Sequence, residues 1–265
     1  MKVAKALLVA AALLGFTQIA EAQQFNQFIA FGDSTTDAGW FANSRLLPVP
    51  NPFDSAVAAA VAAGGNAHFT SPGPGNAQIV AGVFGLTANA ANTPGGTNYA
   101  IGGAFDNAGP VPFSAYTNII LLDYFLSPNP ALPTTAGQIN NYLASVHGQA
   151  NPSALYLISS GGNDVFAALG LGLTAAAATA YFLSDAQALA VSVAHLQAAG
   201  ARYIIVANEY PPPSLPAASV PYGLTLFGAT WSDLTAAGVK LFPRIPSRSS
   251  SQWNKTLSRS ESPLP

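Results

Sequence analysis

The stretch that decides the fold of this chain runs from residue 28 to residue 37 and reads FIAFGDSTTD. Its first four residues are apolar, which is typical of a strand that is buried on both faces. A Gly-Asp-Ser turn follows directly, and it would hold the Ser34 hydroxyl at the mouth of a sheet. Because ligands of α/β proteins bind at the carboxyl ends of the strands, Ser34 is the first candidate for chemistry.

Short apolar segments alternate with longer Ala- and Leu-rich segments along the chain, which predicts a parallel sheet flanked by helices. The expected strands are 25–31, 99–101, 154–159 and 203–207, with a weaker fifth at 239–242. The expected helices are 76–84, 134–146 and 174–199, together with one inside 215–238 that begins near Leu226. Ser184 and Asp185 mark the point where 174–199 could divide into two helices. Residues 46–75 are rich in Pro, Gly and Asn and predict a loop-dominated insertion.

The first 22 residues have the pattern of an export signal. Two lysines precede an apolar run at 6–16, which is too short to span a bilayer comfortably. Ala20-Glu21-Ala22 then places small residues where a signal peptide is cut. We therefore expect cleavage near Ala22 and an exported protein that is secreted, periplasmic or at the cell surface. An N-terminal membrane anchor is the alternative.

Composition narrows the classes of function. The chain has no cysteine, which excludes disulfides, thiol chemistry and cysteine-bound metals. Only 8% of its residues are charged and its net charge is −2, so no basic face for nucleic acid is expected. About 240 residues would remain after cleavage, enough for one α/β domain with a sizeable core.

Three separated blocks follow apolar strands: Gly32-Asp33-Ser34 followed by Asp37, Asn98-Tyr99-Ala100-Ile101-Gly102-Gly103-Ala104, and Gly161-Gly162-Asn163-Asp164. In this order they resemble the SGNH hydrolases, also called the GDSL family of esterases and lipases. The resemblance covers residues 25–242. Smaller matches at 138–140 and 199–203 are similar to the secreted and autotransporter-passenger branch of the family.

The resemblance implies a flavodoxin-like three-layer α/β/α sandwich that hydrolyses small-molecule or lipid carboxylic esters without a metal, nucleotide or other cofactor. It makes Ser34 the nucleophile. The oxyanion hole would combine the Ser34 backbone N–H, the Gly103 backbone N–H and the Asn163 side-chain amide. Fixed donors aimed at a developing oxyanion can each contribute about 10²–10³ in rate. Gly102 is the alternative to Gly103, and counting five residues on from Asn98 favours Gly103.

Each block also has a purely structural interpretation. Ser34 could cap the following helix, and Asn163-Asp164 could cap the next one. Gly102-Gly103 could be an ordinary turn after a strand. The aspartates of the blocks are expected to hold loops and helix starts by hydrogen bonding rather than to transfer protons: Asp33, Asp37 and Asp164.

The general base that would activate the serine is missing from the sequence. A serine hydroxyl is a weak nucleophile until an adjacent base takes its proton. The family supplies that base from an Asp-x-x-His block near the C-terminus, and no such block occurs in these 265 residues. The residues three positions before His68, His147 and His195 are Gly65, Ala144 and Ser192. None of the three histidines is a good replacement.

The composition changes after the domain expected at 23–243. Residues 244–265 are basic, serine-rich and proline-bearing, so we expect a disordered tail. Our hypothesis is that a frameshift or premature end gave rise to this tail, which would leave the sandwich C-terminally truncated. A longer form with a C-terminal barrel would associate with the outer membrane.

Three functions remain open at this point. The first is an exported ester hydrolase whose turnover is reduced by the missing Asp-His pair. The second is an inactive remnant or binding module that keeps the substrate cleft. The third is an esterase that acts on acetylated carbohydrate.

Overall fold

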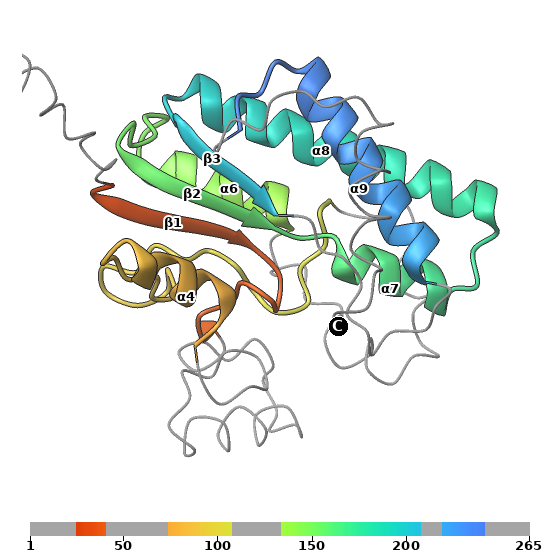
Figure 1. Cartoon of the computed structure of the whole chain (residues 1–265), viewed down its shortest axis with the longest axis horizontal. Coiled ribbons are helices and arrows are strands. Elements are labelled where there is room, and N and C mark those ends of the chain that lie inside the picture. The colour runs from red at the N-terminus through yellow and green to blue at the C-terminus, as the bar shows by residue number, and fades with distance from the viewer. Residues whose placement is uncertain (1–24, 41–73, 108–133, 208–218, 242–265) are drawn as a thin grey trace, which may run out of the picture.

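The computed structural model describes residues 25–40, 74–107, 134–207 and 219–241. These residues form an α/β fold with three parallel strands in one sheet and five helices (Figure 1), which confirms the predicted class. The expected signal segment 1–22, most of the 46–75 insertion and the 244–265 tail lie outside the described residues.

The sheet has the strand order β1-β2-β3. Its strands are β1 (Gln27–Gly32), β2 (Ala154–Ser159) and β3 (Tyr203–Ala207). Both pairings are parallel, with Gly32 opposite Ser159 and Ser159 opposite Ala207. The bounds of β2 and β3 are those predicted from the sequence, and those of β1 differ by two residues at its start and one at its end.

Two further segments extend the sheet by a few contacts at each edge. The Tyr99 N–H donates to the Ala30 carbonyl oxygen at 2.8 Å, and Leu241 forms a single parallel bridge with Ile204. The predicted strand at 99–101 is therefore a short pairing, and so is the described part, 239–241, of the one predicted at 239–242. Across the sheet, the order is the segment at Tyr99, β1, β2, β3 and the segment at Leu241. Numbered by position along the chain, this order is 2-1-3-4-5. This is the flavodoxin-like order, in which the chain reverses its direction of travel beside β1.

The helices are α4 (Asn76–Val83), α6 (Thr135–Ser145), α7 (Gly162–Gly170), α8 (Ala175–Ala198) and α9 (Ser219–Ala236). α8 is one continuous helix, so the expected division at Ser184 and Asp185 is wrong. Its buried positions recur at helical spacing on both sides of that point and keep one face against the core.

α9 begins at Ser219, earlier than the predicted start near Leu226. Pro221 lies in the first turn, where its missing N–H leaves no helical hydrogen bond unmade. The Tyr222 hydroxyl donates to the Leu173 carbonyl oxygen at 3.2 Å, and its ring packs on Phe182 of α8. Tertiary contacts therefore hold a first turn that the sequence pattern did not reveal.

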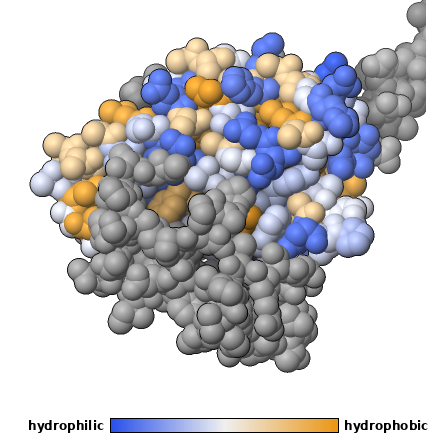
Figure 2. Space-filling model, turned by 180° about the vertical axis from the view of Figure 1, so that it is seen from behind, coloured by the Kyte–Doolittle hydropathy of each residue, from blue (hydrophilic) through white to orange (hydrophobic). Residues whose placement is uncertain are grey.

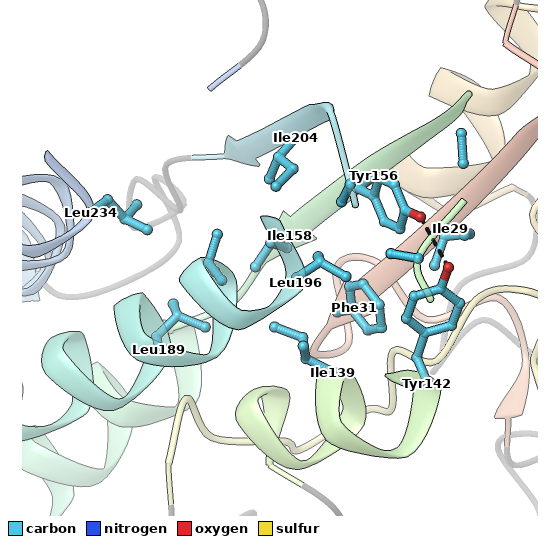
Figure 3. Packing of buried hydrophobic residues seen from close by; sticks show 14 of the residues in the cluster. Ile29, Phe31, Ile139, Tyr142, Tyr156, Ile158, Leu189, Leu196, Ile204 and Leu234 are labelled. Carbon is cyan, nitrogen blue, oxygen red and sulfur yellow. Dashed lines mark hydrogen bonds between the residues drawn. The ribbon is translucent and has the colours of Figure 1, made fainter. Parts of the chain in front are cut away.

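The core forms on both faces of the sheet, because successive strand residues point in opposite directions. One face packs on α6 and α8, as Figure 3 shows, and the other packs on α4. The first face carries Ile29, Phe31, Tyr156, Ile158 and Ile204; the second carries Phe28, Ala30, Leu155 and Leu157. The sheet is thus the middle of three layers, as predicted.

A hydrogen-bonded tyrosine pair links α6 to β2 inside this core (Figure 3). The Tyr142 and Tyr156 hydroxyl oxygens are 3.0 Å apart, and the Tyr156 hydroxyl donates to the Asn151 carbonyl oxygen at 2.9 Å. Burial, followed by the bond to Tyr142, raises the pKa of Tyr156 well above its usual value.

Replacing Tyr156 by Phe should lower the free energy of unfolding by about 1 kcal/mol, because two buried hydrogen bonds are lost while the ring is kept. Urea unfolding measures the change. Tyr99→Phe is the matched control, since the Tyr99 hydroxyl makes only an exposed contact to Ser145 Oγ at 3.3 Å. Equal losses in both variants would contradict the prediction.

The surface carries hydrophobic and hydrophilic residues in small neighbouring groups on the face shown in Figure 2. Within the described ranges, no helix combines the length and the apolar character that crossing a membrane would require.

Candidate active site

The turn that carries Ser34 starts at a glycine that no other residue could replace without strain. Gly32 has φ +145°, and a Cβ placed on it would lie 1.8 Å from the Ser159 carbonyl oxygen. The Asp33 N–H donates to that same oxygen at 3.3 Å, so the chain stays paired with β2 up to the residue before Ser34.

Gln138 of α6 fixes the backbone of the same glycine. Its Oε1 accepts from the Gly32 N–H at 2.8 Å, and its Nε2 donates to the Gly32 carbonyl oxygen at 2.9 Å. The Gln138 side chain is buried, so both bonds are shielded from water. Sequence reasoning noted residues 138–140 only as a family likeness and missed this role. A glutamine on the buried face of an amphipathic helix was the available signal.

Asp33, and not Ser34, caps the turn that follows. The Asp33 Oδ1 accepts from the Thr35 N–H and from Thr35 Oγ1, both at 3.0 Å, and the Asp33 carbonyl oxygen accepts from the N–H groups of Thr36 and Asp37. Ser34 is half-buried, and none of the described residues forms a hydrogen bond with its hydroxyl. The hydroxyl is therefore not used as a cap.

Asp37 joins the first block to the second. Its Oδ1 accepts from the N–H groups of Gly39 and Trp40, and its Oδ2 accepts from the Gly102 N–H, all at 2.8 Å. The carboxylate is buried and satisfied by three backbone donors. One of these bonds occupies the Gly102 N–H, while Gly103 has a φ of +84° that favours glycine.

Asn98 makes a second link between the same two blocks. Its Nδ2 donates to the Thr36 carbonyl oxygen at 2.7 Å, and its Oδ1 accepts from the Ala100 N–H at 3.0 Å. The side chain is fully buried, so these bonds hold the second block against the serine turn.

The third block reaches the second through Asn163. The chain turns at Gly161, with φ +112°, and Asn163 lies in the first turn of α7. Its Nδ2 donates to the Ala104 carbonyl oxygen at 2.8 Å, next to Gly103. An amide nitrogen carries two hydrogens, and this bond uses one of them.

Asp164 holds the same region from the next position. Its Oδ2 accepts from the Asp106 N–H at 3.1 Å, and its Oδ1 accepts from the Tyr181 hydroxyl at 3.0 Å. With Asp33 and Asp37, Asp164 confirms the expectation that these aspartates hold loops and helix starts.

The family model for GDSL-like lipases and acylhydrolases matches residues 28–259. The chain belongs to this family. The matched range includes all three blocks and runs beyond residue 242, where the resemblance in the sequence was expected to end. The family consists of ester hydrolases, which agrees with a serine presented at the end of β1.

A curated relative also matches this GDSL-like chain. It is an uncharacterized protein in the trpE-trpG intergenic region of Pseudomonas putida, with 33% identity over 194 residues. The match covers 69% of this chain and 28% of the relative, so this chain spans little more than a quarter of that protein's length.

The described histidines of this GDSL-like chain lie at the wrong edge of the sheet to serve Ser34. His147 follows α6 and precedes the amino end of β2, and His195 lies in the last turn of α8, before the amino end of β3. Ser34 follows the carboxyl end of β1, which runs parallel to both strands. A six-residue strand spans roughly 17 Å, so neither imidazole reaches the hydroxyl. His68 lies outside the described residues.

In the part of the chain that the structure describes, no group of three or more His, Cys, Asp or Glu residues has an arrangement that could hold a metal ion.

Proposed function

We propose that this chain is an ester hydrolase domain in which Ser34 is the nucleophile and Gly103 and Asn163 stabilise the oxyanion. One observation carries the proposal: the Asn163 amide is bonded to Ala104, beside Gly103, at the sheet edge where the Ser34 turn ends. All three blocks therefore lie at the carboxyl end of the sheet near β1, the edge at which α/β proteins bind ligands.

The backbone bonds support Gly103 as the second donor. The Gly102 N–H is committed to the Asp37 carboxylate, so it is not available to a substrate. Attack on an ester carbonyl places negative charge on its oxygen, and donors that are already fixed by the fold need no reorganisation at that moment. The second hydrogen of the Asn163 amide would serve the same oxygen.

The proposed substrates are small-molecule or lipid carboxylic esters, and the proposed location is outside the cytoplasm after cleavage near Ala22. We expect slow turnover, because the 265 residues contain no Asp-x-x-His block and both described histidines lie at the opposite edge. An oxyanion hole and substrate binding alone leave some catalysis when triad members are absent.

The second candidate is a binding module that binds a ligand at this edge and does not hydrolyse it. The position of His147 and His195 favours it, because neither can act as the base for Ser34. The two candidates differ in whether any ester cleavage depends on the Ser34 hydroxyl.

Replacing Ser34 by Ala should greatly reduce hydrolysis of a short-chain aryl ester, because no nucleophile remains to form the acyl-enzyme. The matched control is Ser184→Ala, which removes an exposed hydroxyl from α8 and should leave the rate unchanged. Labelling of Ser34 by a fluorophosphonate gives a second readout of an activated hydroxyl. Equal hydrolysis by the parent chain and Ser34→Ala would eliminate the enzyme and leave the binding module.

A further inference from the structure

Three buried carboxyl groups lie directly behind Asn163. Asp106 follows the second block, Asp164 lies in α7 and Asp185 lies in α8, and none is more than 1% exposed. Asp164 is the centre of the group, since it accepts from the Asp106 N–H and from the Tyr181 hydroxyl.

Asp185 has no cationic partner among the described residues. With both Asp164 and Asp185 ionised, neither carboxyl oxygen of Asp185 would have a hydrogen bond of good geometry, although both oxygens are buried. The groups that act on its ionisation are Asp164, Asp106 and Tyr181, and none of them is a cation. A buried carboxylate without a donor or a counter-charge is strongly unfavourable.

The basic groups of the described chain lie far from this cluster. The Lys240 N–H donates to Gln197, which is twelve residues after Asp185 and so roughly 18 Å further along α8. Arg202 lies immediately before the amino end of β3, and the cluster is at the opposite edge. α9 also packs on α8, but the hydroxyl of its Tyr222 donates to the Leu173 carbonyl oxygen and not to the carboxyl cluster. Among the residues that the structure describes, a proton is therefore what can neutralise one of these carboxyls.

The electrostatics agree with this geometry. Burial, followed by repulsion from Asp185, raises the pKa of Asp164 well above its usual value. Burial also raises the pKa of Asp185, to about 7. Two such groups titrate as a pair, and the first proton to leave belongs to the pair rather than to one residue.

We propose that Asp164 and Asp185 form a protonated, hydrogen-bonded carboxyl pair, and that this pair is the positioning element that holds Asn163 toward the serine turn. The positioning role rests on the proposed function, in which Asn163 stabilises the oxyanion. Neither aspartate touches the substrate.

The connection to Asn163 is direct. Asn163 and Asp164 are neighbours in the first turn of α7, and they bond to Ala104 and to Asp106 of the same loop. The hydrogen bond of the pair ties Asp164, and with it this turn, to α8. Ionisation of Asp185 leaves a buried negative charge beside Asp164 without a cation to offset it, which disfavours the packed position of this turn.

The protonated carboxyl can be observed in the unmodified chain. Infrared spectra at pH 6 should contain the carbonyl band of a protonated carboxylic acid, because exposed carboxyls are ionised at that pH. Asp185→Asn, which keeps the shape and supplies an amide donor to Asp164, should remove the band. Asp233→Asn on α9 is the matched control and should keep it. A parent chain without the band overturns the proposal whether or not the chain hydrolyses esters.

Stability should depend on pH through the same pair. Folded Asp185 keeps a proton up to about pH 7, whereas an unfolded aspartate releases it near 3.8. The folded state therefore binds more protons between these values, and stability falls as pH rises through them. We expect the melting temperature of the parent to fall by about 5–10 °C from pH 4 to pH 7. Asp233→Asn should keep this fall and Asp185→Asn should reduce it, and a parent with no fall would count against the pair.

The positioning role is tested by the NMR signals of the Asn163 side-chain amide. Ionisation of a pair with only a structural role would not shift these signals. The side-chain amide NMR signals of Asn163, assigned by their absence in Asn163→Ala, should shift as pH rises from 6 to 8 in the parent and stay constant in Asp185→Asn. In an active chain, kcat should fall over the same range in the parent only, with KM unchanged. Identical amide shifts in both proteins would overturn the positioning role. If the shifts differ but no Ser34-dependent hydrolysis is found, only the proposed function fails.

Discussion

Gly32→Ala should leave little or no folded protein, with a loss of more than about 4 kcal/mol in the free energy of unfolding. The new Cβ would lie 1.8 Å from the Ser159 carbonyl oxygen, and that oxygen belongs to the strand paired with Gly32. Relief of the clash would separate β1 from β2 at the end that carries Ser34. The φ of +145° adds backbone strain for any residue with a side chain.

Gly82→Ala is the matched control for this variant. Gly82 lies inside α4, and a Cβ there meets nothing within 4 Å. Alanine favours a helix over glycine, so the control should be more stable than the parent by up to about 1 kcal/mol. Far-UV circular dichroism with urea unfolding measures both changes. A Gly32→Ala protein with the stability of its parent would mean that the β1–β2 pairing at Ser159 is wrong.

Asn163→Ala should lower kcat for ester hydrolysis by about 10²–10³ while KM changes little, because the amide acts on charge that develops only in the transition state. The same substitution removes the bond to the Ala104 carbonyl oxygen, which costs about 1 kcal/mol in stability. The effect on rate should therefore far exceed the effect on folding.

Asn141→Ala controls for the loss of an amide, since Asn141 is exposed on α6 and should affect neither quantity. Steady-state kinetics on the same aryl ester, together with melting curves, separates the two effects. A fall in kcat/KM that comes entirely from KM would show that Asn163 binds the substrate without stabilising the oxyanion.

Much of the fold could be predicted because the decisive signals are local. The apolar run of β2 is followed in the sequence by Ser160-Gly161 and that of β3 by Asn208-Glu209, and the helix at 174–199 ends before Gly200. The start of α9 and the continuity of α8 could not be predicted, because contacts between helices decide them. Tyr222 holds the first turn of α9 against Phe182, and this contact joins residues that are distant in the sequence.

The site could be predicted only in part, for a similar reason. The residue types of the three blocks indicated Ser34, Gly103 and Asn163, because each block is short and contiguous. The choice between Gly102 and Gly103 depended on where the Asp37 carboxylate points, which no spacing reveals. The sequence also does not indicate that the Asp185 carboxyl needs a proton, since an aspartate within a helix is usually exposed to solvent.

The two hydrogen bonds between the Gln138 side chain and the Gly32 backbone determine when the serine turn acquires its shape during folding. The two residues are 106 positions apart, so a nascent chain has made Ser34 long before it makes the side chain that holds the preceding glycine. Contacts of such long separation form late, because the intervening chain must first be ordered. Any fragment that stops before α6 would contain the complete first block and still lack the bonds that fix its backbone. Ser34 should therefore react with a serine-directed probe only after α6 has docked on the sheet.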